Sequence, residues 1–360
     1  MRRLLLAAWI LIPCAVFASP TELIPILETL VNLSTREARS PEATPTNIPP
    51  GLTLRLGSKG KRVTQLNNRL AELGFKASGE HFDALTDAAV RSYQQSVGIT
   101  VDGRVDEQTR FNLNLSNRDK IALLRAQFDE MEGLFAANAD SRFVVVNLPA
   151  FSLQAFDKGK RVLESRVVIG SPARPTPLMK TSLTGIVLNP PWAPPPTILA
   201  KDIFRGGEIN PRTVSRLGLK LIDASGKPVP LDAISTQSDL DANDYRLMQA
   251  PGDKNALGRL KFDLDNPFGV YLHDTNHRDL FQKDFRALSS GCVRVDRFRE
   301  LAAWMLGNKP GEVDQALLDH RTRRLDVEKI PVFTVYWPAE SVGGLVVFHR
   351  DIYDRLRNPH

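Results

Sequence analysis

The sequence predicts two folded units of different class: a small unit of three helices, and a larger, mostly β unit that carries a helical insertion. Three observations predict this multidomain fold. Apolar residues recur at helical spacing between residues 54 and 113, short β-branched runs begin at residue 142, and a long polar stretch interrupts them from 197 to 248. The 360 residues, 42% of them hydrophobic, are enough for two cores and connecting segments.

The first 18 residues are typical of a secretory signal peptide. Arg2 and Arg3 precede an apolar stretch from Leu4 to Phe17, and Ala18 ends a short motif of the kind that signal peptidase cleaves. The apolar stretch is too short to span a bilayer comfortably, although its retention as an N-terminal anchor stays open. We therefore expect an exported protein.

Two segments are expected to flank the helical unit. Residues 19–50 contain a short apolar, helix-like stretch and then SPEATPTNIPPG, whose Pro and Thr content indicates a flexible spacer. Residues 116–139 are predicted to form a bridging helix, because Ser116 and Asp119 have the spacing of a capping box. Its apolar face would consist of Ile121, Leu124, Phe128, Met131 and Phe135.

Residues 51–115 are expected to form the helical unit itself. Apolar residues at helical spacing predict a first helix that ends at Gly74, and a second runs from about Asp83 to Val97. The Asp102-Gly103 turn leads into a third helix. The apolar positions of the first helix are Val63, Leu66, Leu70 and Leu73.

Residues 140–340 are expected to form the mostly β unit. RFVVVNLPAFSLQAF, KRVLESRVVIG and LTGIVLNPPW are short, β-branched runs separated by Pro and Gly, which is typical of strands. Residues 197–248 are interpreted as an insertion without its own core that covers one face of the sheet as a lid, with helices near 197–204 and 211–217. Residues 341–360 are expected to form a C-terminal extension.

Cys292 is the first candidate for chemistry. Cleavage after Ala18 would leave it as the single cysteine, in a compartment where cysteines usually pair. His273 follows a β-rich run and precedes Cys292 by 19 positions. A thiol attacks a carbonyl effectively as a thiolate, so we expect the imidazole to lower the thiol pKa and hold an ion pair. The alternative is a buried, inert cysteine.

Gly291 indicates a place where backbone and substrate come close. A residue without a side chain allows the Cys292 amide N–H to point at the oxygen of a tetrahedral intermediate. From spacing alone, a cysteine and a histidine about twenty residues apart are a weak signal. The surrounding strings are much more specific.

LRLGSKGKRVTQLNNRLAELGF and FDALTDAAVRSYQQSVGITVDGRVDEQT closely resemble the peptidoglycan-binding module family. The resemblance covers about sixty residues, Leu54 to Leu113, mostly structural glycines and core leucines. It implies a three-helix fold and attachment to the cell wall. Service as a spacer or propeptide is the alternative.

YLHDT and SSGCVRV, preceded by APGDKNALGRLKF, resemble the L,D-transpeptidase catalytic domain family with its YkuD-like fold. VVVNLPAFSLQAF, RVVIGSPARPTP and LNPPWAPPPTI extend the similarity, toward the larger Gram-negative branch, over residues 142 to about 306. This implies a β-sandwich catalytic domain. The residues that fall on the family motif are His273, Ser289, Gly291, Cys292 and Arg294.

Two positions depart from the family pattern. Ser290 stands where many members carry a second histidine, which weakens any mechanism that needs two imidazoles. Ala193 occupies a place where the branch often has asparagine, so the cover over the site is expected to differ.

The resemblance implies a thioester mechanism on peptidoglycan stem peptides. Cys292 would attack the carbonyl of the third residue, a diamino acid such as meso-diaminopimelate, and expel the terminal D-alanine of a tetrapeptide donor. The side-chain amine of a neighbouring stem would then resolve the acyl-enzyme, giving a third-to-third cross-link. His273 would act as general base and acid, with a backbone carbonyl orienting its other nitrogen.

The remaining site residues are expected around this pair. Tyr271 should share a face with His273 and line the site or assist the oxyanion donors, together with Gly291 and the adjacent Ser289 and Ser290. Arg294 is interpreted either as a structural hydrogen-bonding group or as a contact to a substrate carboxylate. The resemblance also implies that a carbapenem acylates Cys292.

Two other functions stay open. Water in place of the amine would make the protein a carboxypeptidase or an endopeptidase. A wall-binding adaptor with an inactive second domain is the non-enzymatic alternative, against which the intact His273 and Cys292 argue. For any of the three, the expected location is the periplasm, in association with the cell wall.

Other classes of function have little support. The formal net charge of +6 suits an anionic wall polymer and is far too small to indicate nucleic acid. No cofactor and no metal are expected, because the remaining histidines lack partners at ligand spacing. These are His81, His320, His349 and His360. His277 is interpreted as a solvated loop residue, Asp274 as a turn residue and Trp192 as packed under the prolines.

Overall fold

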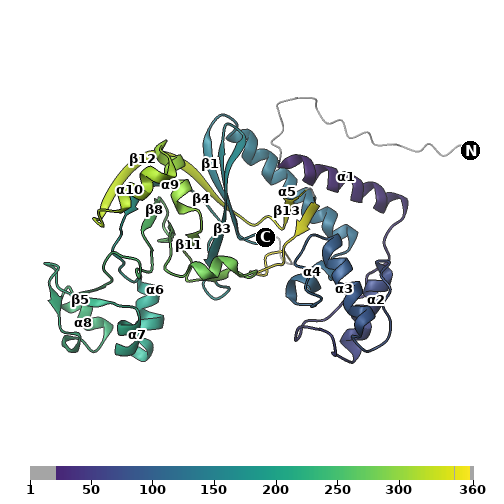
Figure 1. Cartoon of the computed structure of the whole chain (residues 1–360), viewed down its shortest axis with the longest axis horizontal. Helices are drawn as coiled ribbons and strands as arrows, with labels where there is room; N and C mark the ends of the chain where they lie inside the picture. Colours follow the sequence, from purple (N-terminus) through teal and green to yellow (C-terminus); the bar gives the residue numbers. More distant parts are fainter. Residues whose placement is uncertain (1–21, 344, 357–360) are drawn as a thin grey trace, which may run out of the picture.

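The computed structural model describes residues 22–343 and 345–356 (Figure 1). The expected signal peptide, with Cys14 and the cleavage point after Ala18, lies outside the described residues. The insertion and the three-helix unit lie at opposite ends of the molecule, with the large sheet between them. No helix within the two described ranges is both long and apolar enough to cross a membrane.

The larger unit is mostly β, as predicted, and within the described residues its main sheet has nine strands. The order is β10-β3-β11-β9-β8-β4-β12-β1-β2. Because β3 also pairs with β2, the sheet closes on itself. The strands are β1 Arg142–Asn147, β2 Ser152–Asp157, β3 Lys160–Gly170, β4 Met179–Leu188, β8 Leu260–Leu264, β9 Leu272–His273, β10 Ala287–Ser289, β11 Val293–Val295 and β12 Arg323–Val335.

The closed sheet and two helices enclose the main core. The helices are α9, Phe298–Leu306, and α10, Pro310–Leu317, and a short 3-10 helix, Arg278–Gln282, lies in the loop between β9 and β10. Alternate residues of the strands point inward, so Val144, Val146, Leu272 and Val293 are all fully buried in this core. The opposite face of β9 and β11 is therefore free to present polar side chains.

The small unit has the three predicted helices, α2 Lys61–Glu72, α3 Ala84–Ser96 and α4 Glu107–Asn114. Asp83 and Asp106 cap the second and third helices by accepting hydrogen bonds from backbone N–H groups three residues on. The apolar positions predicted for the first helix are confirmed as core. Val63, Leu66 and Leu70 are fully buried, and Leu73 packs against them.

The expectation of a flexible spacer at 19–50 is wrong for most of its length. Leu23–Arg39 form a 17-residue helix, α1, that packs along α5, the bridging helix Asn117–Ala137. Only a short helix-like stretch was expected there. Leu23, Ile26 and Leu30 are buried against α5 and the end of the sheet, and this burial stabilises the helix. The predicted capping box of Ser116 and Asp119 is confirmed.

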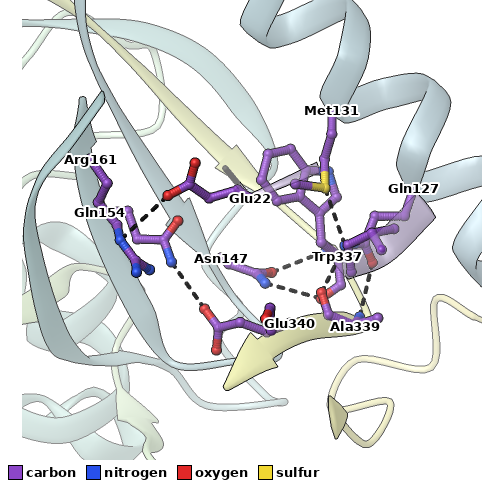
Figure 2. A pocket seen from close by; sticks show the side chains of 11 residues that line it. Glu22, Gln127, Met131, Asn147, Gln154, Arg161, Trp337, Ala339 and Glu340 are labelled. Carbon is purple, nitrogen blue, oxygen red and sulfur yellow. Dashed lines mark hydrogen bonds and ion pairs between the residues drawn. The ribbon is translucent and has the colours of Figure 1, made fainter. Parts of the chain in front are cut away.

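A network of hydrogen bonds joins the long helices to the sheet (Figure 2). The Gln127 amide group, on α5, bonds both the N–H and the carbonyl of Ala339, and Asn147 on β1 does the same for Trp337. A cavity of about 130 Å³ lies among these residues. Each side-chain amide satisfies two buried backbone groups, so this junction is structural.

The described residues after 340, 341–343 and 345–356, are part of the folded body and do not form a separate extension. β13, Ala339–Val342, and β14, Leu345–Phe348, form a hairpin beside the helical unit. Gln108 and Asn112 of α4 both donate to the carbonyl of Phe348, and Gln108 accepts from the Arg350 N–H. The hairpin therefore connects the two units.

The insertion has a core of its own, contrary to the expectation. Its buried residues include Ile203, Val214, Leu221 and Leu247, so it is a small subdomain. Helices occur where they were predicted. The elements are α6 Pro196–Ile198, a π-helical turn Leu199–Ile203, 3-10 turns Arg205–Gly207 and Leu231–Ala233, α7 Pro211–Arg216, α8 Gln237–Ala242, and the strands β5 Lys220–Ile222, β6 Pro228–Val229 and β7 Arg246–Met248.

Candidate active site

The cysteine and the histidine lie on neighbouring strands. β9 and β11 run parallel, with Leu272 opposite Val293 and His273 opposite Arg294. The Val293 N–H donates to the Tyr271 carbonyl at 3.1 Å, which places Cys292 beside Tyr271. Because Leu272 and Val293 point into the core, Tyr271, His273 and Arg294 face the other side. The sheet register thus brings together residues that are 19 positions apart in sequence.

The Cys292 side chain is half-buried. Its sulfur lies 4.0 Å from the Gly269 carbonyl oxygen. Burial raises the pKa of the thiol, and the opposing influences of Tyr271, Lys261 and Arg294 are weaker. Burial also raises the pKa of Tyr271, reinforced by the neighbouring Cys292. Both groups are therefore neutral at pH 7.

His273 is buried, with 5% of its surface exposed. Its Nδ1 is hydrogen-bonded to the Asp274 carbonyl, which can only accept, so Nδ1 carries the proton and Nε2 is the free base. This carbonyl is the orienting group that the sequence analysis expected. Burial, together with the positive charge of Arg294 and Lys261, lowers the pKa of His273 to about 3.

The resting ion pair expected between Cys292 and His273 is not supported. With the thiol pKa raised and the imidazole pKa lowered, the proton stays on sulfur and the ring is neutral. Among the described residues, no hydrogen bond joins the sulfur to the ring. The physical reason is that burial and two nearby cations disfavour an imidazolium. The arrangement suits a general base that removes the proton during attack.

The loop before Cys292 has a fixed backbone. Gly291 has φ +121°, a conformation that other residues rarely adopt. The Ser289 hydroxyl donates to the Cys292 carbonyl at 2.6 Å and accepts from the Gly291 N–H at 3.1 Å. Ser289 thus shapes the loop, whereas the Cys292 N–H makes no hydrogen bond to any described residue. That N–H is therefore available to donate to an oxyanion, the role expected for it from the sequence.

Arg174 and Asp202 are site residues that the sequence analysis missed. Arg174, in the loop after β3, bonds both carboxylate oxygens of Asp202 at 2.7 and 2.8 Å, and it donates to the Ser290 hydroxyl at 2.9 Å. The insertion is thereby tied to the residue two positions before the nucleophile. The string RVVIGSPARPTP contained Arg174, but its partner lies 28 residues away and only the fold brings them together.

Lys261 was also missed. It lies opposite His273 on the adjacent strand β8, and its ammonium is 4.7 Å from the centre of the Tyr271 ring. Asp263 pairs with it at 2.8 Å. The alternation of side chains along a strand could have assigned Lys261 to one face of its strand. It could not have shown that Lys261 lies opposite His273.

Asp274 holds the backbone that orients His273. Its buried carboxylate accepts from the Arg259 N–H at 2.8 Å and from Arg278 at 2.5 Å. Gly258 leaves the space for it, since a Cβ there would lie 2.2 Å from the carboxylate. Asp274 therefore fixes its loop through the side chain and orients the imidazole through its carbonyl.

A cavity of about 950 Å³ lies between the insertion and the active-site loop. Ser290 and Arg294, on either side of Cys292, line it, as do Trp192 and the exposed His277. Trp192 also packs into the core of the insertion. In the described part of the chain, no group of three or more His, Cys, Asp or Glu side chains is placed to hold a metal ion.

The chain matches two families of known proteins. The model of the L,D-transpeptidase catalytic domain matches residues 141–323, and that of a putative peptidoglycan binding domain matches residues 59–110. A putative L,D-transpeptidase of Haemophilus influenzae is 35% identical over 214 residues, which are 58% of this chain. The match spans 44% of that relative's length.

Solved structures of low identity are also similar. An L,D-transpeptidase from Mycobacterium smegmatis is 14% identical, with 54% of this chain and 58% of that one covered and a TM-score of 0.25. The Enterococcus faecium L,D-transpeptidase catalytic domain acylated by ertapenem is 14% identical, with coverages of 43% and 80% and a TM-score of 0.22. These superpositions are loose, so membership rests on the sequence matches. The catalytic-domain match covers half of the chain, including β9 and β11. The chain therefore belongs to the L,D-transpeptidase family, with a peptidoglycan-binding module before the catalytic domain.

Proposed function

We propose that the protein cross-links peptidoglycan by joining the third residues of two stem peptides through a thioester on Cys292. The observation that carries this is the pairing of β9 with β11, which sets the thiol and its free N–H beside the face that bears His273. A nucleophile, a base of the correct tautomer and an oxyanion donor are the parts that acyl transfer needs.

The first half-reaction begins with a neutral pair. As the sulfur attacks the carbonyl of the third residue, the thiol proton passes to Nε2 of His273. The Cys292 N–H donates to the developing oxyanion, a contact worth about 2.7–4 kcal/mol in comparable enzymes. Collapse breaks the peptide bond, and the imidazolium returns the proton to the departing D-alanine amine.

In the second half-reaction, the side-chain amine of another stem attacks the thioester. Neutral His273 accepts the amine proton, and the thiolate leaves and is reprotonated. The low imidazole pKa leaves the ring unprotonated at neutral pH, so Nε2 has a lone pair for the amine proton. Tyr271 faces the sulfur and would stabilise the thiolate as it forms.

The location and the role of the module belong to the same proposal. Residues 1–18 would direct export to the periplasm, and the module at residues 59–110 would attach the enzyme to the wall. The described contacts of Gln108 and Asn112 with the C-terminal hairpin support a fixed placement of the catalytic domain relative to the module.

The test is incubation with purified disaccharide-tetrapeptide, followed by mass analysis. A dimer with loss of one D-alanine is expected, and Cys292→Ala should give none while binding to wall sacculi persists. Formation of tripeptide without dimer would mean that water is the acceptor. Unchanged substrate would mean that the protein binds the wall without catalysing this reaction. Undiminished cross-linking by Cys292→Ala would refute the nucleophile.

A carbapenem offers an independent test of the same sulfur. The Enterococcus faecium relative was solved acylated by ertapenem, which supports the expectation of a covalent adduct here. Intact-protein mass spectrometry should show an increase equal to one ertapenem molecule in the wild type. Cys292→Ser should react at least about 100-fold more slowly, because a serine hydroxyl is a far weaker nucleophile than a thiol. An adduct of equal yield in both proteins would place the reaction elsewhere.

A further inference from the structure

The large cavity beside Cys292 is lined by an excess of positive charge. Five cationic side chains face it: Lys201, Arg205 and Arg216 from the insertion, and Lys254 and Arg294 from the catalytic domain. Among the residues that line it, Asp202 is the only carboxylate. The charges come from segments far apart in sequence, so this concentration arises from folding.

The single carboxylate is already neutralised. Arg174, which lies outside the lining, holds both oxygens of Asp202, and this hydrogen bonding lowers the pKa of Asp202. Lys201, Arg205 and Arg216 have no ion pair with any described residue. Their charges are therefore available to a ligand.

One of the cationic side chains that line the cavity also has a hydrogen-bond donor without an acceptor. The Arg294 Nε is buried and makes no hydrogen bond to a described residue. A buried donor without an acceptor destabilises the empty site, and an anionic ligand that accepts from it would remove that cost. Ser290 and Arg294, which flank Cys292 in the chain, both line the cavity, so a ligand bound there would lie near the nucleophile.

We propose that this cavity is an anion-binding subsite for the carboxylates of an acidic peptide, with Lys201, Arg205 and Arg216 of the insertion as its specificity-determining residues. The inference rests on the proposed function, because the diamino acid and the terminal D-alanine of a stem peptide both carry a free carboxylate. Single exposed pairs contribute up to about 1 kcal/mol each. Several like charges around one cleft also concentrate an anion and speed its encounter.

The experiment compares two alkylating agents that differ in one carboxylate. Iodoacetate and iodoacetamide both transfer a two-carbon group to the Cys292 sulfur and release iodide. The ratio of their rates therefore measures how strongly the site prefers an anion. The variant is Lys201→Gln with Arg205→Gln and Arg216→Gln; the matched control is Arg212→Gln with Lys220→Gln and Lys227→Gln, which removes three charges of the same insertion outside the cavity.

The iodoacetate to iodoacetamide ratio should fall by about tenfold in the variant, the lower end of the usual effect of a charged cleft, and stay unchanged in the control. Added NaCl should lower the wild-type ratio toward the variant's value, which tests the proposal without any mutation. Equal ratios in wild type and variant, insensitive to salt, would overturn the subsite.

A second arm uses the stem tetrapeptide with free or amidated carboxylates as substrate. The variant should raise KM for the free form and leave KM for the amidated form unchanged. A lower alkylation ratio without turnover of any stem peptide would retain the anion subsite and reject the proposed function. Turnover of the stem peptide with an unchanged alkylation ratio would retain the proposed function and reject the anion subsite.

Discussion

At the scale of single residues, the environment of Cys292 and His273 determines how the nucleophile is activated. Many cysteine enzymes keep a thiolate and an imidazolium at rest. In this protein Arg294 and Lys261 are close enough to oppose a positive charge on the ring, and burial opposes charge on both groups. The proton must therefore move as the substrate is attacked.

Alkylation of Cys292 by iodoacetamide should follow this neutral resting state. Because the thiol pKa is raised above its ordinary value of about 8.5, the rate should keep increasing beyond pH 9 and show no plateau between pH 5 and 8. The measurement is the inactivation rate across pH 5–10. A plateau at acidic pH would indicate a resting ion pair and contradict the neutral state.

Gly258→Ala tests whether the carboxylate of Asp274 holds the histidine in place. The added Cβ would lie 2.2 Å from that carboxylate, at φ +61°, so Asp274 must move and its carbonyl with it. We expect a loss of about 1–3 kcal/mol in the free energy of unfolding, and a lower kcat. Urea denaturation and single-turnover kinetics measure the two.

Gly252→Ala is the matched control. Gly252 also has positive φ, +143°, but an added Cβ there meets nothing within 4 Å. The Gly252→Ala variant should lose stability through backbone strain alone, and its kcat should stay at the wild-type value. Equal losses of kcat in both variants would mean that strain in this loop, and not the contact with Asp274, orients His273.

At the scale of elements, the insertion is a small folded subdomain tied to the active-site loop by one bidentate ion pair. Its own core explains why it keeps its shape. The Arg174–Asp202 pair, together with the bond from Arg174 to Ser290, connects it to the residues around Cys292. The position of the insertion and the geometry of the loop are therefore coupled.

Asp202→Asn should weaken that connection. A bidentate, partly exposed pair is worth about 1 kcal/mol, so we expect faster proteolysis of residues 199–210 and a several-fold lower kcat/KM. Asp241→Asn, an exposed change in α8 of the same insertion, should alter neither. If both variants are cleaved like the wild type, the ion pair does not hold the insertion.

The docking of α1 on α5 is a second connection between elements. Ile26 is 1% exposed and packs in the core shared with the sheet, whereas Ile24 on the same helix is 44% exposed. Ile26→Ala should lower the free energy of unfolding by about 2–5 kcal/mol and Ile24→Ala by less than about 0.5 kcal/mol. Urea denaturation compares the two; similar values would mean that α1 is not docked.

At the scale of the whole molecule, stability should depend on pH through the buried histidine. In the unfolded chain His273 binds a proton near pH 6.5, but in the folded chain only near pH 3. Between these values the unfolded state binds more protons, so stability falls as pH decreases, by at most about 1.4 kcal/mol per unit. His273→Gln should remove that part of the slope, which denaturation at pH 4, 5, 6 and 7 measures. An unchanged slope would mean that His273 titrates normally.

The sequence by itself determined the local patterns: the helices of the module, the capping box of Ser116, the short strands, and the strings around His273 and Cys292. These depend on residues near one another in the chain, whose spacing reports helix, strand or turn. It also singled out Gly291, whose φ of +121° is a backbone conformation that other residues rarely adopt.

Only the tertiary structure decided the rest. Arg174 meets Asp202 and Ser290 across 28 and 116 positions, and Lys261 reaches His273 through strand pairing. The helix α1, expected as a spacer, is ordered by its packing, and the neutral state of the thiol and imidazole follows from burial and nearby cations. Contacts between distant segments and the loss of water around a charge arise on folding, so no local pattern of residues contains them.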